Sequence, residues 1–187
     1  MSSAGSGKGL FLDRDGVINH EVGYLWRQED VRFVPGIFDL CRTARRLGYR
    51  LMVVTNQAGI ARGYYSEEDY QTLMTWIKGE LAREGVELDA VYHCPFHPEH
   101  GIGEYRREHE DRKPGTGMLR RGAREFGLDL TECVMVGDRC TDIVAANVAG
   151  LRQAFLIGGT EATGECAGKF IGIEGLGEVE RWLVERS

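Results

Sequence analysis

Short apolar runs alternate with amphipathic stretches along most of the chain. Apolar runs bounded by turn residues, typical of buried strands, lie at residues 10–12, 50–54, 89–94, 133–136 and 153–157. Between them, helical spacing of apolar residues, with capping residues and terminal glycines, predicts helices at residues 37–47, 66–81, 118–126, 142–149 and 175–184. Strands that alternate with helices build a parallel sheet covered by helices. The pattern therefore predicts an α/β fold of the Rossmann type, with a further edge strand near residues 170–171.

One domain accounts for this pattern, because the chain shows no internal repeat and no second apolar core. We expect residues 1–8, which are rich in Ser and Gly, to form a flexible tail, and residues 9–187 to form the single domain. Residues 95–111 are rich in His, Glu, Gly and Arg without periodicity, so we expect a long loop there. Loops of that length inside a compact domain usually serve a function or are flexible.

Composition narrows the classes of function. The chain has 187 residues and a net charge of -6. This negative charge argues against general binding of nucleic acid or anionic membranes, but a few local cations could still bind a small anionic substrate. No run approaches membrane-spanning length, so we expect a cytoplasmic protein with a small-molecule partner, and nothing requires more than a monomer. The odd number of scattered cysteines favours reduced thiols over a disulfide framework. These cysteines are Cys41, Cys94, Cys133, Cys140 and Cys166.

Polar residues follow the apolar runs where ligands bind in such folds, beyond the carboxyl ends of the strands. Asp13 and Asp15 follow the first run, Thr55 and Asn56 the second, and Asp138 the fourth. If the first strand continued far enough, its alternation would place Asp13 and Asp15 on one side. Taken alone, the two aspartates fit a polar strand end facing water equally well, so the residues elsewhere in the chain must decide.

Clustered carboxylates together with a hydroxyl and a lysine fit phosphoryl transfer. The carboxylates would raise one another's pKa unless a cation lay among them, which indicates a hard, oxygen-liganded ion such as Mg²⁺. One carboxylate could then attack phosphorus, while Lys113 and the Thr55 hydroxyl hold the remaining phosphate oxygens.

Four segments in this order resemble the motifs of phosphatases in the haloacid dehalogenase (HAD) superfamily. They are Asp13-Arg14-Asp15-Gly16, Val53-Val54-Thr55-Asn56, Arg112-Lys113-Pro114, and Val136-Gly137-Asp138 with Asp142. The resemblance implies that Asp13 is the nucleophile that forms an aspartyl-phosphate. It also implies that Asp15 protonates the leaving oxygen and later activates water, and that Mg²⁺ is held by Asp13, the Asp15 backbone carbonyl and Asp138. No insertion after the motifs is large enough for a separate cap domain. Asp142 could serve the site or cap the helix that begins there.

A narrower set of segments resembles the family of D-glycero-D-manno-heptose 1,7-bisphosphate 7-phosphatases. The set comprises residues 13–19, 23–24, 55–63, 94–98 and 112–114. The resemblance implies an Mg²⁺-dependent phosphatase that removes the 7-phosphate on the way to nucleotide-activated heptose, a precursor of lipopolysaccharide or capsule. It places Arg112, Asn56 and Arg139 at the substrate, and Glu21, Gly23 and Tyr24 beside the sugar.

Two other functions remain open from the sequence. Histidinol-phosphate phosphatases share much of the same pattern, and the segments around Arg62 and Tyr24 favour a heptose only weakly. A catalytically inactive phosphate-binding or scaffold protein could also use this fold, although Asp13 and Asp15 are both present. The anomer of the heptose bisphosphate is not determined, so the product could belong to an ADP-linked or a GDP-linked pathway.

The long loop departs from the family in its zinc ligands. The family commonly holds a structural zinc with Cys-x-His at the start of this loop and Cys-x-Cys before Arg-Lys-Pro. Here only Cys94 is retained, because Phe96 replaces the histidine and His109 and Asp111 replace the later cysteines. An improvised site would have to use Cys94, His97, His100, His109 and Asp111. We therefore expect a loop without zinc. A further departure is Arg139, where a lysine often follows the motif aspartate.

Overall fold

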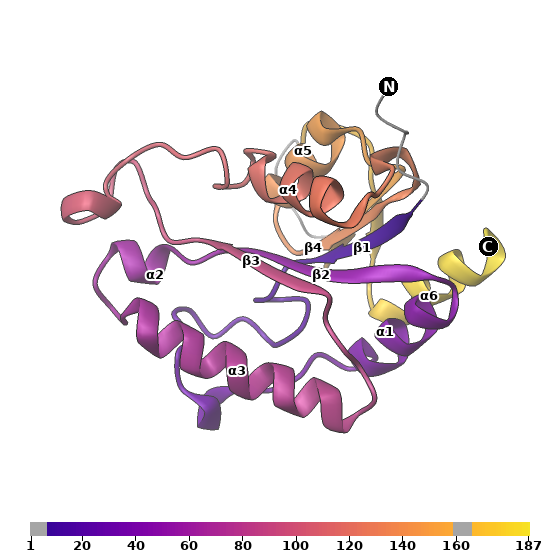
Figure 1. The fold of residues 1–187 in the computed structure, drawn as a ribbon, viewed down its shortest axis with the longest axis horizontal. Coiled ribbons are helices and arrows are strands. Elements are labelled where there is room, and N and C mark those ends of the chain that lie inside the picture. The colour runs from indigo at the N-terminus through magenta and orange to yellow at the C-terminus, as the bar shows by residue number, and fades with distance from the viewer. Residues whose placement is uncertain (1–6, 159–165) are drawn as a thin grey trace.

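A parallel sheet of six strands forms the centre of the computed structural model, which describes residues 7–158 and 166–187 (Figure 1). The strand order is β3-β2-β1-β4-β5-β6, and every neighbouring pair is parallel. The strands are β1 (Lys8–Leu12), β2 (Tyr49–Asn56), β3 (Ala90–Cys94), β4 (Val134–Gly137), β5 (Gln153–Ile157) and β6 (Ile171–Ile173). The predicted α/β fold is confirmed, and the expected edge strand is present as β6.

Helices cover both faces of the sheet. They are α1 (Ile37–Arg46), α2 (Ala58–Ala61), α3 (Glu67–Arg83), α4 (Gly117–Phe126), α5 (Cys140–Ala149) and α6 (Leu176–Glu185). In Figure 1, α4 and α5 lie above the sheet, and α1, α3 and α6 lie below it. The two cores follow the alternation of β1, because Leu10 and Leu12 pack on the α1, α3 and α6 side while Phe11 packs on the α4 and α5 side.

The start of α3 shows how well a local signal defines a helix. Ser66 Oγ accepts a hydrogen bond from the Asp69 backbone N–H at 3.0 Å, and the Asp69 carboxylate accepts one from the Ser66 N–H at 2.8 Å. This reciprocal capping box was predicted from the spacing of the two residues, and it satisfies two donors that the first turn would otherwise leave unpaired.

The strand order reverses direction at β1. From β1 the chain proceeds to β2 and β3 on one side and later returns to β4, β5 and β6 on the other. The carboxyl ends of β2, β1 and β4 are therefore neighbours, although their residues are far apart in sequence. Such a reversal opens a crevice at the end of the sheet, where ligands of α/β proteins bind.

Two boundaries differ from the sequence-based expectation. The strand β1 begins at Lys8, and Gly7 already forms a bridge with Leu128, so the tail expected for residues 1–8 ends earlier, and residues 1–6 lie outside the described part. At its other end β1 stops at Leu12, so strand alternation does not extend to Asp13 and Asp15. The 95–111 loop contains one short 3₁₀ turn, Gly103–Tyr105.

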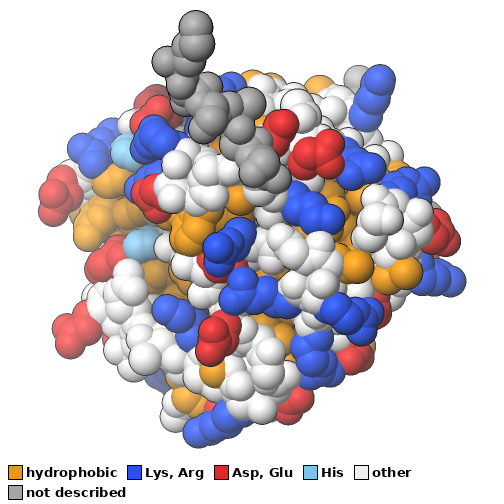
Figure 2. Space-filling model, turned by 45° about the vertical axis from the view of Figure 1, so that its right-hand side comes forward, with side chains coloured by type: hydrophobic (Ala, Val, Ile, Leu, Met, Phe, Trp, Pro, Cys, Tyr) orange, Lys and Arg blue, Asp and Glu red, His pale blue; other side chains and the backbone are white. Residues whose placement is uncertain are grey.

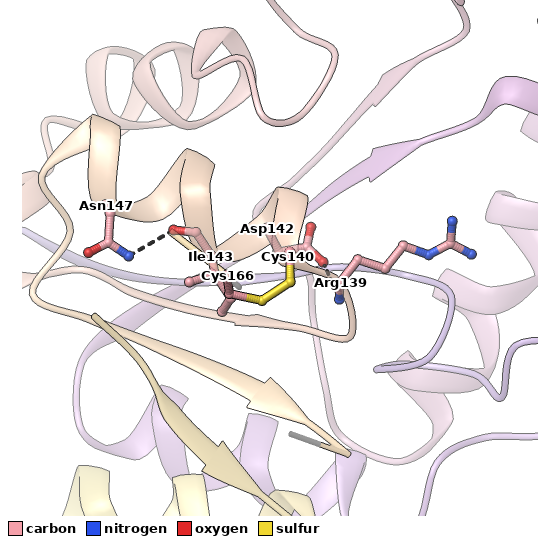
Figure 3. Close-up of a disulfide and its surroundings, with 6 residues drawn as sticks. All are labelled: Arg139, Cys140, Asp142, Ile143, Asn147 and Cys166. Atoms are coloured by element: carbon pink, nitrogen blue, oxygen red, sulfur yellow. Dashed lines mark hydrogen bonds between the residues drawn. A yellow bond between two sulfur atoms is a disulfide. The ribbon is translucent and has the colours of Figure 1, made fainter. Parts of the chain in front are cut away.

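The expectation of five reduced thiols is wrong for one pair. Cys140, at the start of α5, forms a disulfide with Cys166, and their Cα atoms are 5.1 Å apart (Figure 3). The chain returns to α5 between β5 and β6, where the Asn147 side chain also bonds the backbone of Lys169. Cys41, Cys94 and Cys133 are free and buried. A separation of 26 residues carries no local signal, so the sequence could not indicate this pair.

The described surface shows no concentration of positive charge on the face in Figure 2, where basic and acidic side chains are interspersed. Among the described residues, no helix combines the length and apolarity needed to cross a bilayer.

Candidate active site

A cavity of about 460 Å³ lies at the carboxyl ends of the central strands. It is bounded by the turn after β1, the start of α2, the end of the long loop and the start of α5. Nine of the residues expected at the site line it: Asp13, Asp15, Glu21, Gly23, Tyr24, Asn56, Arg112, Lys113 and Arg139. The fold therefore brings together residues from all four sequence motifs.

Lys113 lies at the floor of the cavity between two carboxylates. Its ammonium group is 3.0 Å from Asp13 Oδ1 and 2.5 Å from Asp142 Oδ1, and it donates to the Val54 carbonyl at 2.7 Å. Burial by itself would lower the pKa of Lys113, but the charges of Asp13 and Asp142 raise it above its usual value. Lys113 therefore remains a fixed positive charge in contact with Asp13.

Asn56 positions Lys113 through its backbone. The Asn56 amide accepts from the Lys113 N–H and donates to the Lys113 carbonyl, both at 3.0 Å. Asn56 is the last residue of β2, so this pair of bonds joins the loop that carries Lys113 to the sheet. Asn56 also lines the cavity, as expected for a substrate-binding residue, but its anchoring role was not evident from the sequence.

Asp15 is held by three side chains. Arg14 forms a bidentate pair with it, and the nearest nitrogen lies 2.8 Å from Asp15 Oδ2. Asn19 donates to its Oδ1 at 3.0 Å, and Gln57 donates to its Oδ2 at 3.1 Å. Tyr65 in turn donates to Gln57 at 2.6 Å. Asp15 is thus fixed in one orientation at the cavity wall, not by strand alternation but by this network.

Thr55 lies behind the cavity wall. It is 1% exposed and does not line the cavity, and its hydroxyl accepts a hydrogen bond from Gln57 at 2.9 Å. Gln57 therefore connects Thr55 with Asp15. The expectation that the Thr55 hydroxyl holds phosphate oxygens stays a prediction, and the contact in the structure supports the network around Asp15.

Three carboxylates come together beside β1 in a way that suits a cation. Oxygen atoms of Asp13, Asp138 and Asp142 lie within 4.8 Å of one another, and Asp138 Oδ1 is buried without a hydrogen-bond partner among the described residues. Burial raises the pKa of Asp13 and of Asp138, and repulsion from Asp142 adds to both shifts. A divalent ion would relieve this repulsion and satisfy the unpaired oxygen, so the residues fit Mg²⁺.

Two glycines permit this close packing of carboxylates. A Cβ atom on Gly16 would lie 2.3 Å from Asp138 Oδ2, and Gly16 also has a positive φ of 83°. A Cβ atom on Gly137 would lie 2.2 Å from the Asp142 Cβ. Gly16 therefore lets the turn after β1 approach Asp138, and Gly137 lets the end of β4 approach the first turn of α5.

Asp142 fills both of the roles left open by the sequence. One carboxylate oxygen accepts from the Arg139 backbone N–H at 3.1 Å and so caps α5, while the other pairs with Lys113. The same side chain therefore anchors a helix and holds a charged group of the site.

The outer wall of the cavity contains charged and aromatic side chains. Arg139 pairs with Glu21 at 2.8 Å, and Glu21 also accepts from the Gly23 N–H at 2.7 Å. The ring of Tyr24 contacts Tyr64 edge to face, with 4.5 Å between the centroids. These contacts join the segment after β1 to the start of α5 and to the segment after α2.

The sequence assigned no role to several residues of the site. Arg14 lies between the two motif aspartates, and nothing in the sequence indicated a role for it. Arginine is almost never fully buried unless it is paired, so its burial in the structure indicates a charged partner. Gln57 and Tyr65 lie within or just after the matched 55–63 segment, but their hydrogen bonds depend on the short helix α2, which was not predicted. Arg62 and His97 also line the cavity.

The side chains proposed for an improvised zinc site point to different partners. His97 Nδ1 accepts from the His100 N–H, and His109 Nδ1 accepts from the Asp111 N–H. Cys94 is a buried free thiol. In the part of the chain that the structure describes, the only group of three metal-binding side chains is the cluster of aspartates beside β1.

Comparisons with known proteins identify close relatives. A HAD-hydrolase-like family model matches residues 111–171. The D-glycero-alpha-D-manno-heptose-1,7-bisphosphate 7-phosphatase of Burkholderia mallei is 51% identical over 80% of this chain and 79% of its own length. The D-glycero-beta-D-manno-heptose-1,7-bisphosphate 7-phosphatase of Vibrio cholerae is 46% identical over 79% of this chain and 80% of its own length. This chain is also similar to the crystal structure of D,D-heptose 1,7-bisphosphate phosphatase from B. bronchiseptica complexed with magnesium and phosphate, with a TM-score of 0.82. The two sequences are 28% identical, and the match covers 96% of this chain and 99% of that chain.

Proposed function

The chain belongs to the HAD-like hydrolases, in the family of the heptose 1,7-bisphosphate 7-phosphatases, and we propose that it removes the 7-phosphate of D-glycero-D-manno-heptose 1,7-bisphosphate. The observation that carries this proposal is the contact of Asp13 with Lys113 in a cavity that also contains Asp15. A nucleophile, a fixed cation and a second acid are the groups that hydrolysis through an aspartyl-phosphate requires.

Asp13 and Asp15 divide the chemistry between them. Asp13 attacks phosphorus and forms the aspartyl-phosphate, while Lys113 stabilises negative charge on the transferred group. Asp15 donates a proton to the leaving sugar oxygen and later accepts a proton from the attacking water. Arg14, Asn19 and Gln57 hold Asp15 in place for both transfers.

Mg²⁺ would bind where the carboxylates converge. Asp13, Asp138 and the Asp15 backbone carbonyl are its proposed ligands, and Asp142 stands next to them. The unpaired buried oxygen of Asp138 supports this assignment. When bound, the ion neutralises the phosphate oxygens and lowers the repulsion between the carboxylates. Thr55 is proposed to support Asp15 from behind the cavity wall, through Gln57.

The outer residues are proposed to select the sugar. Arg112 is positioned by a hydrogen bond of 3.1 Å to the Phe96 carbonyl and has no carboxylate partner among the described residues. It therefore suits an anionic group of the substrate better than the ammonium group of histidinol phosphate. Glu21, Gly23, Tyr24 and Arg139 lie where the sugar would project from the transferred phosphate.

The charge of the proposed substrate indicates where the reaction takes place. A sugar bisphosphate with several negative charges does not cross a bilayer, so we place the reaction in the cytoplasm, on the route to nucleotide-activated heptose. None of the roles proposed for these residues requires a second copy of the chain, so we propose a monomer.

Phosphate release from a small substrate panel tests the proposal. The panel contains both anomers of the heptose bisphosphate, histidinol phosphate and fructose 1,6-bisphosphate, each with Mg²⁺. We expect a clear preference for a heptose bisphosphate, and a preference for histidinol phosphate would overturn the assignment. Asp13→Asn should abolish turnover while circular dichroism and the melting temperature show an intact fold. Retained turnover in that variant would reject the covalent mechanism and the role of Asp13.

Mg²⁺ binding can be measured without turnover. In the wild type, Mg²⁺ should raise the melting temperature, because an ion that binds only the folded state stabilises it. Asp138→Asn should remove most of this increase, with Ca²⁺-free buffer and chelator as the reference state. An unchanged increase in the variant would place the ion elsewhere.

A further inference from the structure

The long loop at residues 95–111 extends beyond the end of the sheet. It runs from the end of β3 around to the start of α4, as Figure 1 shows. Ordering each residue of such a loop costs conformational entropy, so the loop needs stabilising contacts of its own. The family resemblance expects a zinc ion to supply them, with ligands at the positions of Cys94, Phe96, His109 and Asp111.

These four positions do not fit a zinc ion in this chain. Phe96 offers no ligand atom, and the carboxylate of Asp111 pairs with Arg121 of α4 at 3.5 Å. The structure describes the whole loop, and in it no three ligand atoms of His, Cys, Asp or Glu lie within 4.8 Å of one another. A structural zinc requires a closed tetrahedral set of such atoms. Another contact must therefore hold the two ends of the loop together.

The ring of Phe96 is contacted by three side chains of the same loop. The His109 ring stacks on it, with 4.7 Å between the centroids and 26° between the planes. The guanidinium carbon of Arg107 lies 3.9 Å from the centroid of the Phe96 ring, and the Tyr105 ring lies at 6.0 Å. Aromatic pairs and cation–π contacts at such distances stabilise a structure beyond the area that they bury. Two of the expected zinc positions, 96 and 109, are thus joined directly by their rings.

Hydrogen bonds join the same two ends of the loop. The His97 N–H donates to the Tyr105 carbonyl and the Arg112 N–H donates to the His109 carbonyl, both at 3.0 Å. The side chain of Arg112 reaches back to the start of the loop, where its Nη1 donates to the Phe96 carbonyl at 3.1 Å. Phe96 therefore contacts the end of the loop through its ring and Arg112 through its backbone. The position of Phe96 thus affects where Arg112 lies at the cavity.

We propose that the Phe96 ring orders the long loop in place of a metal ion and so holds Arg112 at the cavity, which makes Phe96 a positioning residue. The ordering of the loop follows from its own contacts. Its consequence for the reaction rests on the proposed function, which places Arg112 at the substrate. Because a stack of rings with a guanidinium contains no ion, the order of the loop is independent of chelators and of added Zn²⁺.

Hydrogen exchange measures the order of the loop without any substrate. Phe96→Ala should raise the exchange rates of the His97 and Arg112 amides by about tenfold, because the loss of the stacked ring shifts the loop toward its open form. Phe96→Tyr keeps the ring and should exchange like the wild type. Phe96→Leu keeps an apolar side chain without an aromatic face, should give a smaller increase, and replaces the alanine variant if that one does not fold. Phe170→Ala, which removes an exposed ring outside the loop, is the matched control and should leave these rates unchanged.

The metal is tested on the wild type in the same experiment. EDTA and added Zn²⁺ should leave the exchange rates of the loop unchanged, and elemental analysis of the purified protein should find no zinc. One equivalent of zinc, together with faster exchange in EDTA, would overturn the proposal.

Steady-state kinetics separates positioning from a general loss of structure. Phe96→Ala should raise KM for the heptose 1,7-bisphosphate by about 3- to 10-fold with kcat within about twofold, the pattern expected when substrate binding is lost and the chemical step is kept. The chemical step is kept because Asn56 at the end of β2, and not the loop stack, holds Lys113 beside Asp13. Phe96→Tyr should restore the wild-type KM.

The two measurements distinguish the possible failures. Wild-type exchange of the loop in a folded Phe96→Ala or Phe96→Leu protein overturns the proposal, and so does an equal increase in the Phe170→Ala control. Faster exchange with an unchanged KM overturns the positioning of Arg112. A wild type that does not hydrolyse the heptose bisphosphate contradicts the proposed function alone, because the exchange rates still decide how the loop is held.

Discussion

The network behind Asp15 predicts that Tyr65→Phe will impair catalysis, although no hydrogen bond joins Tyr65 to Asp15 in the part of the chain that the structure describes. Tyr65 donates to Gln57 Oε1 at 2.6 Å, and Gln57 Nε2 donates to Asp15 at 3.1 Å and to Thr55 at 2.9 Å. Tyr65 is 7% exposed and Gln57 is 1% exposed, so water cannot readily replace the lost hydroxyl. Removing this hydroxyl leaves the Gln57 oxygen without its donor.

The size of the effect follows from the lost hydrogen bond. A buried acceptor left unsatisfied costs about 1–3 kcal/mol in free energy of unfolding. For a chain of this size, each kcal/mol lowers the melting temperature by about 2–4 °C. The Gln57 amide can escape part of this cost by rotating, but then its oxygen faces Asp15 and Asp15 loses a donor. If the poorer positioning of Asp15 raises the activation free energy by about 1.4 kcal/mol, kcat/KM falls about tenfold.

Urea unfolding and steady-state kinetics check this prediction together. The loss should be equal for the heptose 1,7-bisphosphate and the heptose 7-phosphate, because in the proposed mechanism Asp15 protonates the leaving oxygen of both. Tyr64→Phe is the matched control, since Tyr64 is 53% exposed and keeps its ring against Tyr24 after the change. The reasoning is refuted if Tyr65→Phe retains wild-type stability and kcat/KM, or if the control loses as much.

Two further predictions concern stability. The side chain of Asp89 is 6% exposed and pairs with Arg45 and Arg50 at 2.8 Å each. Burial tends to raise the pKa of Asp89, but hydrogen bonds from a backbone N–H and from the arginines lower it below its usual value. The stabilisation by Asp89 is therefore complete above its unfolded pKa of about 3.9 and is lost as the pH falls through its lower folded pKa. Asp89→Asn should lower the free energy of unfolding in urea by about 1–3 kcal/mol at pH 7 and by much less near pH 3. An equal loss at both pH values would contradict this. Cys166→Ser should remove about 3 kcal/mol by freeing the chain between Cys140 and Cys166 in the unfolded state. Thiol titration of the unfolded wild type should find three thiols without reductant, and five would disprove the disulfide.

Much of the fold, and the convergence of the candidate site residues, could be predicted from the sequence. Apolar periodicity indicated the strands and the five long helices, and the Ser66 capping box marked the start of α3. Asp13 and Lys113 were identified from the motifs, and the structure brings them to 3.0 Å. The predictions of the helices, the strands and the closeness of these two side chains succeeded because periodicity and capping depend on neighbours in the chain, and parallel strands then place their ends at one edge of the sheet.

The tertiary structure alone decided how these groups are held and what else faces them. Asp13 and Asp15, one residue apart in the sequence, share the cavity not through strand alternation but because Gln57 and Arg14 fix Asp15 from another direction. The pairing of Asp142 with Lys113 and the disulfide of Cys140 with Cys166 likewise join residues remote in sequence. Periodicity reports only the local backbone, whereas burial and hydrogen-bond partners depend on which distant segments the folded sheet makes neighbours.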